Sequence, residues 1–189
     1  MSYSNKKINN LATQWAYDEW WWPNLPLLSK DEIEYYARDY IGNSRLDIDY
    51  AGLRWNFGGT WNRDRDDTEF NPDTVKRVVD ALAMFTLYTG SRSDYHRWTA
   101  NGRWHSSYGL KHRMEDLFRT HFNEEYSYVS NGEFIVAYLY LMSQHFQCPY
   151  TQKSIGSMIR FNAFDINAYI RMPRIFENVA DRWLFGGTN

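Results

Sequence analysis

Residues 130–146 read SNGEFIVAYLYLMSQHF, and this segment decides the fold. Ser130 and Glu133 have the Ser-x-x-Glu spacing of a capping box, in which each side chain satisfies a free backbone N–H group of the first helical turn. The residues from Phe134 to Met142 are all apolar. A helix that is apolar on every side must be surrounded by other elements. The segment therefore predicts a buried central helix around which the chain packs.

Further helices are predicted on both sides of this segment. Ser29 and Glu32 form another capping box, before a helix that ends near Gly42. Asn71 and Pro72 are residue types preferred at a helix N-cap and at the first helical position. Apolar residues at helical spacing also predict helices in several other ranges. These ranges are about 4–21, 107–122, 152–161, 165–171 and a last helix that begins at Pro173.

One segment has the two-residue period of a strand. Apolar and polar residues alternate over 46–50 and again over 53–57, and a turn at Ala51-Gly52 would join them into a hairpin. Residues 58–71 and 91–105 follow neither period and are predicted to be irregular. We therefore expect a mainly α fold, with α+β as the alternative: a single globular domain over 1–189, compact and helical, with one small antiparallel β-hairpin.

Composition limits the class of protein. The chain has 189 residues, which suits one domain, and a net charge of −2, which gives no general attraction to nucleic acid or acidic membranes. Cys148 is the only cysteine, so no intramolecular disulfide can form. The longest apolar run is about half of the roughly 20 residues that a membrane-spanning helix needs. We expect a soluble, cytoplasmic protein that uses no membrane.

Aromatic residues make up 19% of the chain, and nine of them are tryptophans. Large aromatic side chains fill cores and also dominate the energetics of interfaces. Trp20, Trp21 and Trp22 are consecutive, and successive helical positions are separated by about 100°. One helix cannot turn all three indoles inward, so at least one is exposed or covered by a partner. The alternative is that the chain folds back at Pro23 and buries the third indole.

The first functional hypothesis is therefore a non-catalytic binding protein that uses an aromatic-rich surface on a macromolecular partner. An inhibitor or an assembly factor that binds another protein would act in this way. The sequence contains no glycine-rich phosphate loop and no common zinc or serine-hydrolase motif, so no cofactor is predicted. In composition the chain is similar to small accessory proteins of bacteriophages, a resemblance that assigns a role to no residue.

The second hypothesis is nucleic-acid binding through a basic and aromatic segment, residues 91–113. Over residues 91–121, six Arg and Lys stand against three Asp and Glu, a local charge of +3. Arginine neutralises phosphate, and aromatic rings stack on unpaired bases. The candidate contacts are Arg92, Arg97, Trp98, Arg103, Trp104 and Lys111. The alternative is that arginine packs on tryptophan at the rim of the core and that Lys111 pairs with Glu115 along a helix.

The third hypothesis is a metal-dependent phosphoryl-transfer enzyme. Asp47 and Asp49 would point to the same side of a strand, and Asp64 and Asp66 follow in the next loop. Clustered carboxylates can hold a divalent cation for such chemistry. The neighbouring arginines of that loop would repel a cation. The alternative is that these acidic and basic side chains form ion pairs with one another.

Overall fold

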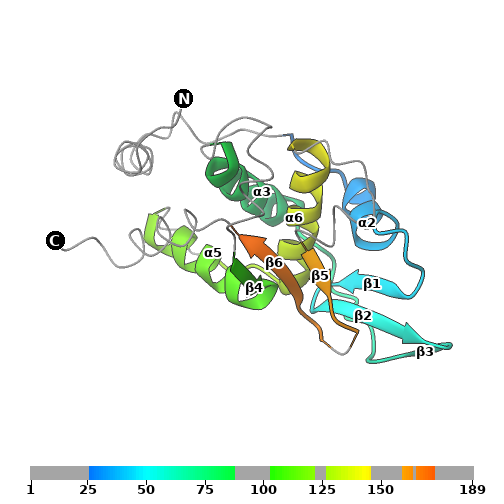
Figure 1. Cartoon of the computed structure of the whole chain (residues 1–189). Coiled ribbons are helices and arrows are strands. Elements are labelled where there is room, and N and C mark those ends of the chain that lie inside the picture. Colours follow the sequence, from blue (N-terminus) through cyan, green and yellow to red (C-terminus); the bar gives the residue numbers. More distant parts are fainter. Residues whose placement is uncertain (1–25, 88–102, 122–126, 146–158, 164, 173–189) are drawn as a thin grey trace.

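The computed structural model describes residues 26–87, 103–121, 127–145, 159–163 and 165–172 (Figure 1). Within these ranges the helices are α2 (Lys30–Arg38), α3 (Pro72–Leu87), α5 (Ser107–His121) and α6 (Asn131–His145). The strands of the same ranges are β1 (Leu46–Asp49), β2 (Gly52–Phe57), β3 (Thr60–Trp61), β4 (Arg103–Ser106), β5 (Ile159–Phe161) and β6 (Ala168–Met172).

The strands form two three-stranded antiparallel sheets, with the orders β1-β2-β3 and β4-β6-β5. The fold of the described ranges is therefore mixed α+β. The prediction of a mainly α domain with one small hairpin is wrong, because a whole second sheet was missed and the hairpin itself continues into β3. The predicted hairpin is confirmed: β1 and β2 pair on either side of the turn at Ala51-Gly52.

The error concerns three stretches of chain. Residues 152–161 and 165–171 were predicted as short helices, but β5 and β6 occupy their described parts. β4 lies at the end of a stretch predicted to be irregular. In β6 the sequence AYIRM alternates between buried and half-buried side chains, which is a strand period. Five residues contain too few repeats to separate that period from a helical one, and the pairing partner β4 is distant in sequence.

The prediction for the central helix is confirmed. Every side chain of α6 from Phe134 to Leu139 is almost fully buried, and so are Leu141 and Met142. The helix contacts α2, α3, α5 and both long strands of the first sheet. Figure 1 shows α6 between α3 and α2, with the second sheet beside α5. The apolar character of α6 on all sides thus follows from its having neighbours on all sides.

The predicted capping interactions are present and also connect helices. Ser130 and Glu133 form the expected reciprocal pair, with the Ser130 N–H donating to Glu133 Oε2 (2.8 Å) and the Glu133 N–H donating to Ser130 Oγ (3.0 Å). The second carboxylate oxygen of Glu133 accepts from the Asn71 N–H (2.8 Å). Asn71 in turn accepts from the Asp73 N–H at the start of α3. One buried carboxylate therefore fixes the N-termini of α6 and α3 together.

Asn131 connects the two sheets. Its amide nitrogen donates to the Ala51 carbonyl in the hairpin turn (3.3 Å) and to the Ile166 carbonyl before β6 (3.0 Å). Its Oδ1 accepts from the Ser107 hydroxyl at the start of α5 (2.6 Å), and that hydroxyl accepts from the Ala168 N–H (3.1 Å). The first residue of the central helix thus joins the hairpin turn, α5 and β6.

Glycine is required where α6 meets the hairpin turn. The Gly132 N–H donates to the Tyr50 carbonyl (3.2 Å), and a Cβ atom on Gly132 would overlap the carbonyl oxygen of Asp49. On the turn itself, Gly52 has φ of +128°, and a Cβ there would overlap the Ile166 carbonyl oxygen. The two backbones therefore approach more closely than any side chain allows.

Helices predicted over 4–21 and from Pro173 onward lie outside the described residues. The predicted helices near 30–41, 72–90, 107–122 and 131–146 are confirmed as α2, α3, α5 and α6 over their described parts, and α2 ends at Arg38, a few residues earlier than predicted. None of the helices in the described ranges has both the length and the apolar content that crossing a lipid bilayer requires.

We predict that Gly132→Ala lowers the free energy of unfolding by about 1–3 kcal/mol, and nearer the upper value because backbone atoms would have to move. Gly109→Ala is the matched control inside α5, where the added methyl group would lie 3.2 Å from the Ser106 hydroxyl, a side chain that can rotate. It should change stability by less than about 1 kcal/mol. Urea unfolding of both variants measures the difference, and equal stabilities would contradict the close-packing account.

Candidate functional site

The candidate site is the half-exposed side of the second sheet, which we call the arginine–tryptophan face. Cross-strand pairing places Trp104 opposite Arg171 and Tyr169 opposite Arg160. Side chains opposite one another in a sheet lie on the same side, so these four form one surface. The other side of β6 is buried in the core. It carries Ala168, Ile170 and Met172.

Two arginines stack on the indole of this face. The guanidinium carbon of Arg160 lies 4.0 Å from the centre of the Trp104 ring, and that of Arg171 lies 5.7 Å from it. A cation over the face of an indole is attracted by the ring quadrupole, and tryptophan is the best aromatic partner for it. The interaction holds two long side chains, from β5 and from β6, against one ring on β4.

A hollow of about 510 Å³ lies beside the stacked rings. It is lined by Trp104, Arg160, Phe161, Asn162, Ala163 and Tyr169. The Tyr169 hydroxyl donates to Asp165 (2.8 Å), and this hydrogen bond raises the pKa of the tyrosine. The phenol therefore stays neutral and its ring is held in place. The hollow is widely open to solvent rather than enclosed.

Sequence reasoning identified one member of this face and missed three. Trp104 was a predicted contact. Arg160, Tyr169 and Arg171 were missed because their strands were predicted as helices, although the alternation in AYIRM was a usable signal. Arg103 is paired with Met172, so strand alternation puts it on the side of the sheet opposite Trp104. The remaining predicted contacts of this segment, Arg92, Arg97 and Trp98, and the run Trp20, Trp21 and Trp22 lie outside the described residues.

Lys111 lies on α5 and is only 3% exposed. Its ammonium donates to Glu115 Oε1 (3.1 Å), which confirms the pair anticipated along the helix. The same ammonium lies 5.0 Å from the Tyr108 ring centre and 4.7 Å from that of Tyr128. A charge that is buried, paired and flanked by two rings favours a structural role over a phosphate contact.

Glu115 connects α5 to the segment before α6. Besides Lys111, its carboxylate accepts from the Val129 N–H (3.0 Å) and lies 2.7 Å from His112 Nδ1. Burial alone would raise the pKa of Glu115, but the three hydrogen bonds together lower it below its ordinary value. The carboxylate is therefore ionised in the folded protein at neutral pH and stabilises the junction.

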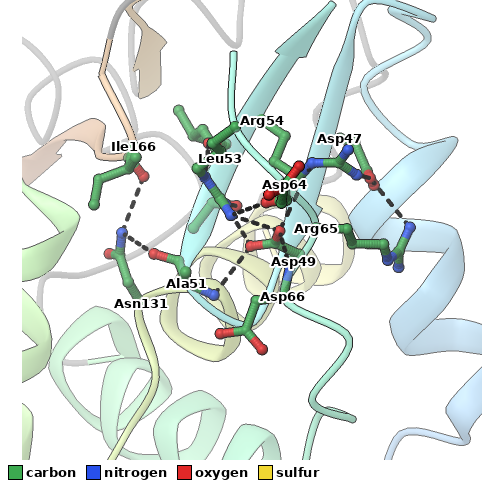
Figure 2. Close-up of polar contacts among 12 residues, drawn as sticks. Asp47, Asp49, Ala51, Leu53, Arg54, Asp64, Arg65, Asp66, Asn131 and Ile166 are labelled. Atoms are coloured by element: carbon green, nitrogen blue, oxygen red, sulfur yellow. Dashed lines mark hydrogen bonds and ion pairs between the residues drawn. The ribbon is translucent and has the colours of Figure 1, made fainter. Parts of the chain in front are cut away.

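The two aspartates of the first sheet, Asp47 and Asp49, form ion pairs with arginines. Asp49, which is 1% exposed, accepts two hydrogen bonds from the Arg63 guanidinium. It also accepts from the backbone N–H groups of Asp66 (2.9 Å) and Ala51 (3.0 Å). Figure 2 shows Asp49 among these contacts, with Arg54 beside it. Such a saturated carboxylate anchors the loop after β3 to the hairpin.

Asp47 also forms hydrogen-bonded ion pairs with two arginines. Its Oδ2 accepts from Arg54 (3.0 Å) and from Arg65 (3.2 Å). Asp64 is exposed, and Asp66 accepts from the Thr68 N–H (3.1 Å) at the surface of the loop. Within the described ranges, no three His, Cys, Asp or Glu side chains are grouped so as to hold a metal ion. This geometry favours the ion-pair interpretation of Asp47 and Asp49 over the metal-site hypothesis, whereas Asp64 and Asp66 form no ion pair of the expected kind with the residues that the structure describes.

Comparisons with protein-family models, with curated proteins and with solved structures find no match for this chain. A functional interpretation therefore depends on the geometry of the described residues.

We predict that Asp49→Asn lowers the free energy of unfolding by about 3–5 kcal/mol, because it leaves the Arg63 charge without its buried partner. The value should lie near the lower limit, since the Arg63 side chain is 21% exposed. The control Glu34→Gln removes an exposed pair with Arg38 and should cost less than about 1 kcal/mol. Chemical unfolding of the two variants and the wild type measures both losses of stability. A small cost for Asp49→Asn would contradict the anchoring role.

A second prediction concerns pH. Because the pKa of Glu115 is lowered on folding, its stabilising contribution is present at neutral pH and is lost as pH falls below 4.5, its ordinary value. Glu115→Gln should therefore be less stable than the wild type at pH 7, and the difference should shrink as pH falls from about 5 to 3. Thermal unfolding across this range measures it. A difference that does not change with pH would contradict the assignment.

Proposed function

We propose that the protein is a non-catalytic binding protein that holds a macromolecular partner on the arginine–tryptophan face. The observation that carries this proposal is the stacking of Arg160 and Arg171 on Trp104 beside a hollow of about 510 Å³. Tryptophan, tyrosine and arginine are the residues in which interface hot spots are enriched. Here all three types occur on one side of one small sheet.

The other polar clusters support the same interpretation. Asp47 and Asp49 bind arginines of their own chain, and Glu115 binds Lys111 and a backbone N–H group. Groups held in such contacts are suited to fixing elements of the fold in place. The arginine–tryptophan face differs from them, because Arg160 is exposed and no described carboxylate forms an ion pair with it.

The two roles expected from the sequence, inhibitor and assembly factor, both require a surface of this kind. An inhibitor would cover a working surface of its partner, and an assembly factor would hold its partner in one arrangement. The compositional similarity to small accessory proteins of bacteriophages is compatible with either role.

We predict that Trp104→Ala and Arg160→Ala each reduce the recovery of the partner by about tenfold or more, as expected for hot-spot residues. The tagged wild type and variants would be used to isolate complexes from a native lysate, and the bound fraction would be quantified by mass spectrometry. Arg119→Ala is the control, because Arg119 is an exposed arginine of α5 that pairs with Asp116.

Full recovery with both face variants, or equal losses with the control, would contradict the proposal. Catalytic turnover of a nucleotide or a nucleic acid by the purified protein alone would contradict its non-catalytic part.

A further inference from the structure

The start of α6 contains a chemically labile dipeptide, Asn131-Gly132. In flexible chains an asparagine that precedes glycine deamidates readily, because glycine has no Cβ to shield its backbone nitrogen. That nitrogen attacks the amide carbon of the asparagine side chain and forms a new carbon–nitrogen bond. The proton of the attacking nitrogen leaves with the side-chain NH₂ group as ammonia, and a cyclic succinimide remains. Water then opens the ring to give aspartate or isoaspartate.

Packing requires both residues of this dipeptide. A Cβ atom on Gly132 would overlap a backbone carbonyl of β1, so no side chain fits there. The residue before it must both donate and accept hydrogen bonds. The Asn131 amide nitrogen donates to the Ala51 and Ile166 carbonyls, and its Oδ1 accepts from the Ser107 hydroxyl. Asparagine is a short side chain that carries both kinds of group. The fold therefore places a labile dipeptide where its elements meet.

The folded structure blocks each step of the reaction. The attacking nitrogen, that of Gly132, donates its proton to the Tyr50 carbonyl (3.2 Å). The Asn131 side chain is held at both its oxygen and its nitrogen, and the nitrogen also donates to Asn167 Oδ1 (3.2 Å). Asn131 is 4% exposed, so water has little access to a succinimide there. Deamidation therefore requires these contacts to open, either locally or with the whole fold.

The products do not fit the place that the asparagine occupied. Each product has a carboxylate where the amide was, and a carboxylate oxygen would face the Ala51 and Ile166 carbonyls, which only accept hydrogen bonds. The Ser107 hydroxyl is the donor that remains from the original contacts. A buried charge with so few donors is strongly unfavourable. Isoaspartate also lengthens the backbone by a methylene group next to Gly132, where two backbones are in contact.

We propose that Asn131 is a modification site that makes the opening of the α6 N-terminus irreversible. It is deamidated in molecules whose contacts at Asn131 and Gly132 have opened, and the product prevents these contacts from forming again. A reversible opening thus becomes a one-way step that limits the lifetime of the folded protein. A partner that binds the closed form would extend this lifetime. The inference is independent of the proposed function, because it uses no residue of the arginine–tryptophan face.

The first test compares the folded and the unfolded full chain. Both are kept for several days at physiological temperature and mildly alkaline pH, in buffer and in concentrated urea, and peptide mapping by mass spectrometry locates aspartate and isoaspartate. In urea, Asn131 should deamidate about as fast as Asn101, which also precedes a glycine. In buffer, Asn131 should react at least about 100-fold more slowly than in urea, which corresponds to an opening free energy of about 2.8 kcal/mol or more. Equal rates in buffer and in urea would overturn the proposal.

Two variants separate the chemistry from the opening. In urea, Gly132→Ala should slow the reaction at Asn131 and leave Asn101 unchanged, because the added methyl group hinders the attacking nitrogen. In buffer, Ser107→Ala leaves the dipeptide intact but removes one of its contacts, and should accelerate deamidation by about 5- to 150-fold. The control Glu34→Gln, which removes an exposed ion pair of α2, should not accelerate it.

No acceleration in Ser107→Ala, or the same acceleration in the control, would overturn the proposal. If Ser107→Ala does not fold, wild-type protein in urea below its unfolding transition gives the same test. The deamidation rate there should rise in proportion to the population of open molecules, because the reaction is slow compared with opening and closing. A rate that does not change with urea would contradict the requirement for opening.

The irreversible part of the proposal has its own test. Asn131→Asp reproduces one product and should unfold at a lower urea concentration than the wild type. The control Asn43→Asp keeps the oxygen that accepts from the Arg45 N–H and should change the transition little. Wild-type chains refolded after incubation in urea are separated by size, and chains modified at Asn131 should be depleted from the native fraction. Wild-type stability of Asn131→Asp, or equal modification of the native and non-native fractions, would overturn the one-way step.

Discussion

The described structure depends on the N-terminus of the central helix α6, where three consecutive residues bind three different parts of the chain. Asn131 donates to the hairpin turn and to the Ile166 carbonyl, Gly132 allows backbone contact with the hairpin, and Glu133 accepts from Asn71 at the start of α3. Asn131 and Glu133 are buried, and Gly132 has no side chain. Because buried polar groups are costly unless hydrogen-bonded, these contacts permit only one arrangement of the surrounding elements.

The candidate site follows from this junction. The Ser107 hydroxyl that donates to Asn131 accepts from the N–H of Ala168, the first residue of β6. Strand β6 is therefore fixed at the point where it begins, and its alternation then decides which side chains face outward. Tyr169 and Arg171 point away from the core, and β4 and β5 bring Trp104 and Arg160 beside them. The stacking on Trp104 orders the arginines that the proposed function needs.

Features encoded by neighbouring residues could be predicted from the sequence. The capping boxes at Ser29 and Ser130, the Asn71-Pro72 start of α3 and the β1–β2 hairpin each depend on a few adjacent residues, and each is present. The second sheet depends on pairing between β4 and β6, which lie far apart in the chain, and its short strands have weak periods. The site was accordingly recognised only in part, through Trp104, while Arg160 and Arg171 needed the sheet to bring them together. Lys111 has a suitable side chain for binding phosphate, and its pairing with Glu115 could be anticipated from their spacing, but the sequence alone could not show that Lys111 is buried beside the rings of Tyr108 and Tyr128.

The most direct test of the account is a map of the binding surface by nuclear magnetic resonance. Isotope-labelled protein would be titrated with the unlabelled partner isolated from the native lysate, and shifts of backbone amides and of the tryptophan indole N–H signals would be followed. The account predicts that among the described residues the largest shifts occur in β4, β5 and β6, with the Trp104 indole among them. Shifts concentrated in β1, β2 and β3, with the signals of the second sheet unchanged, would contradict it.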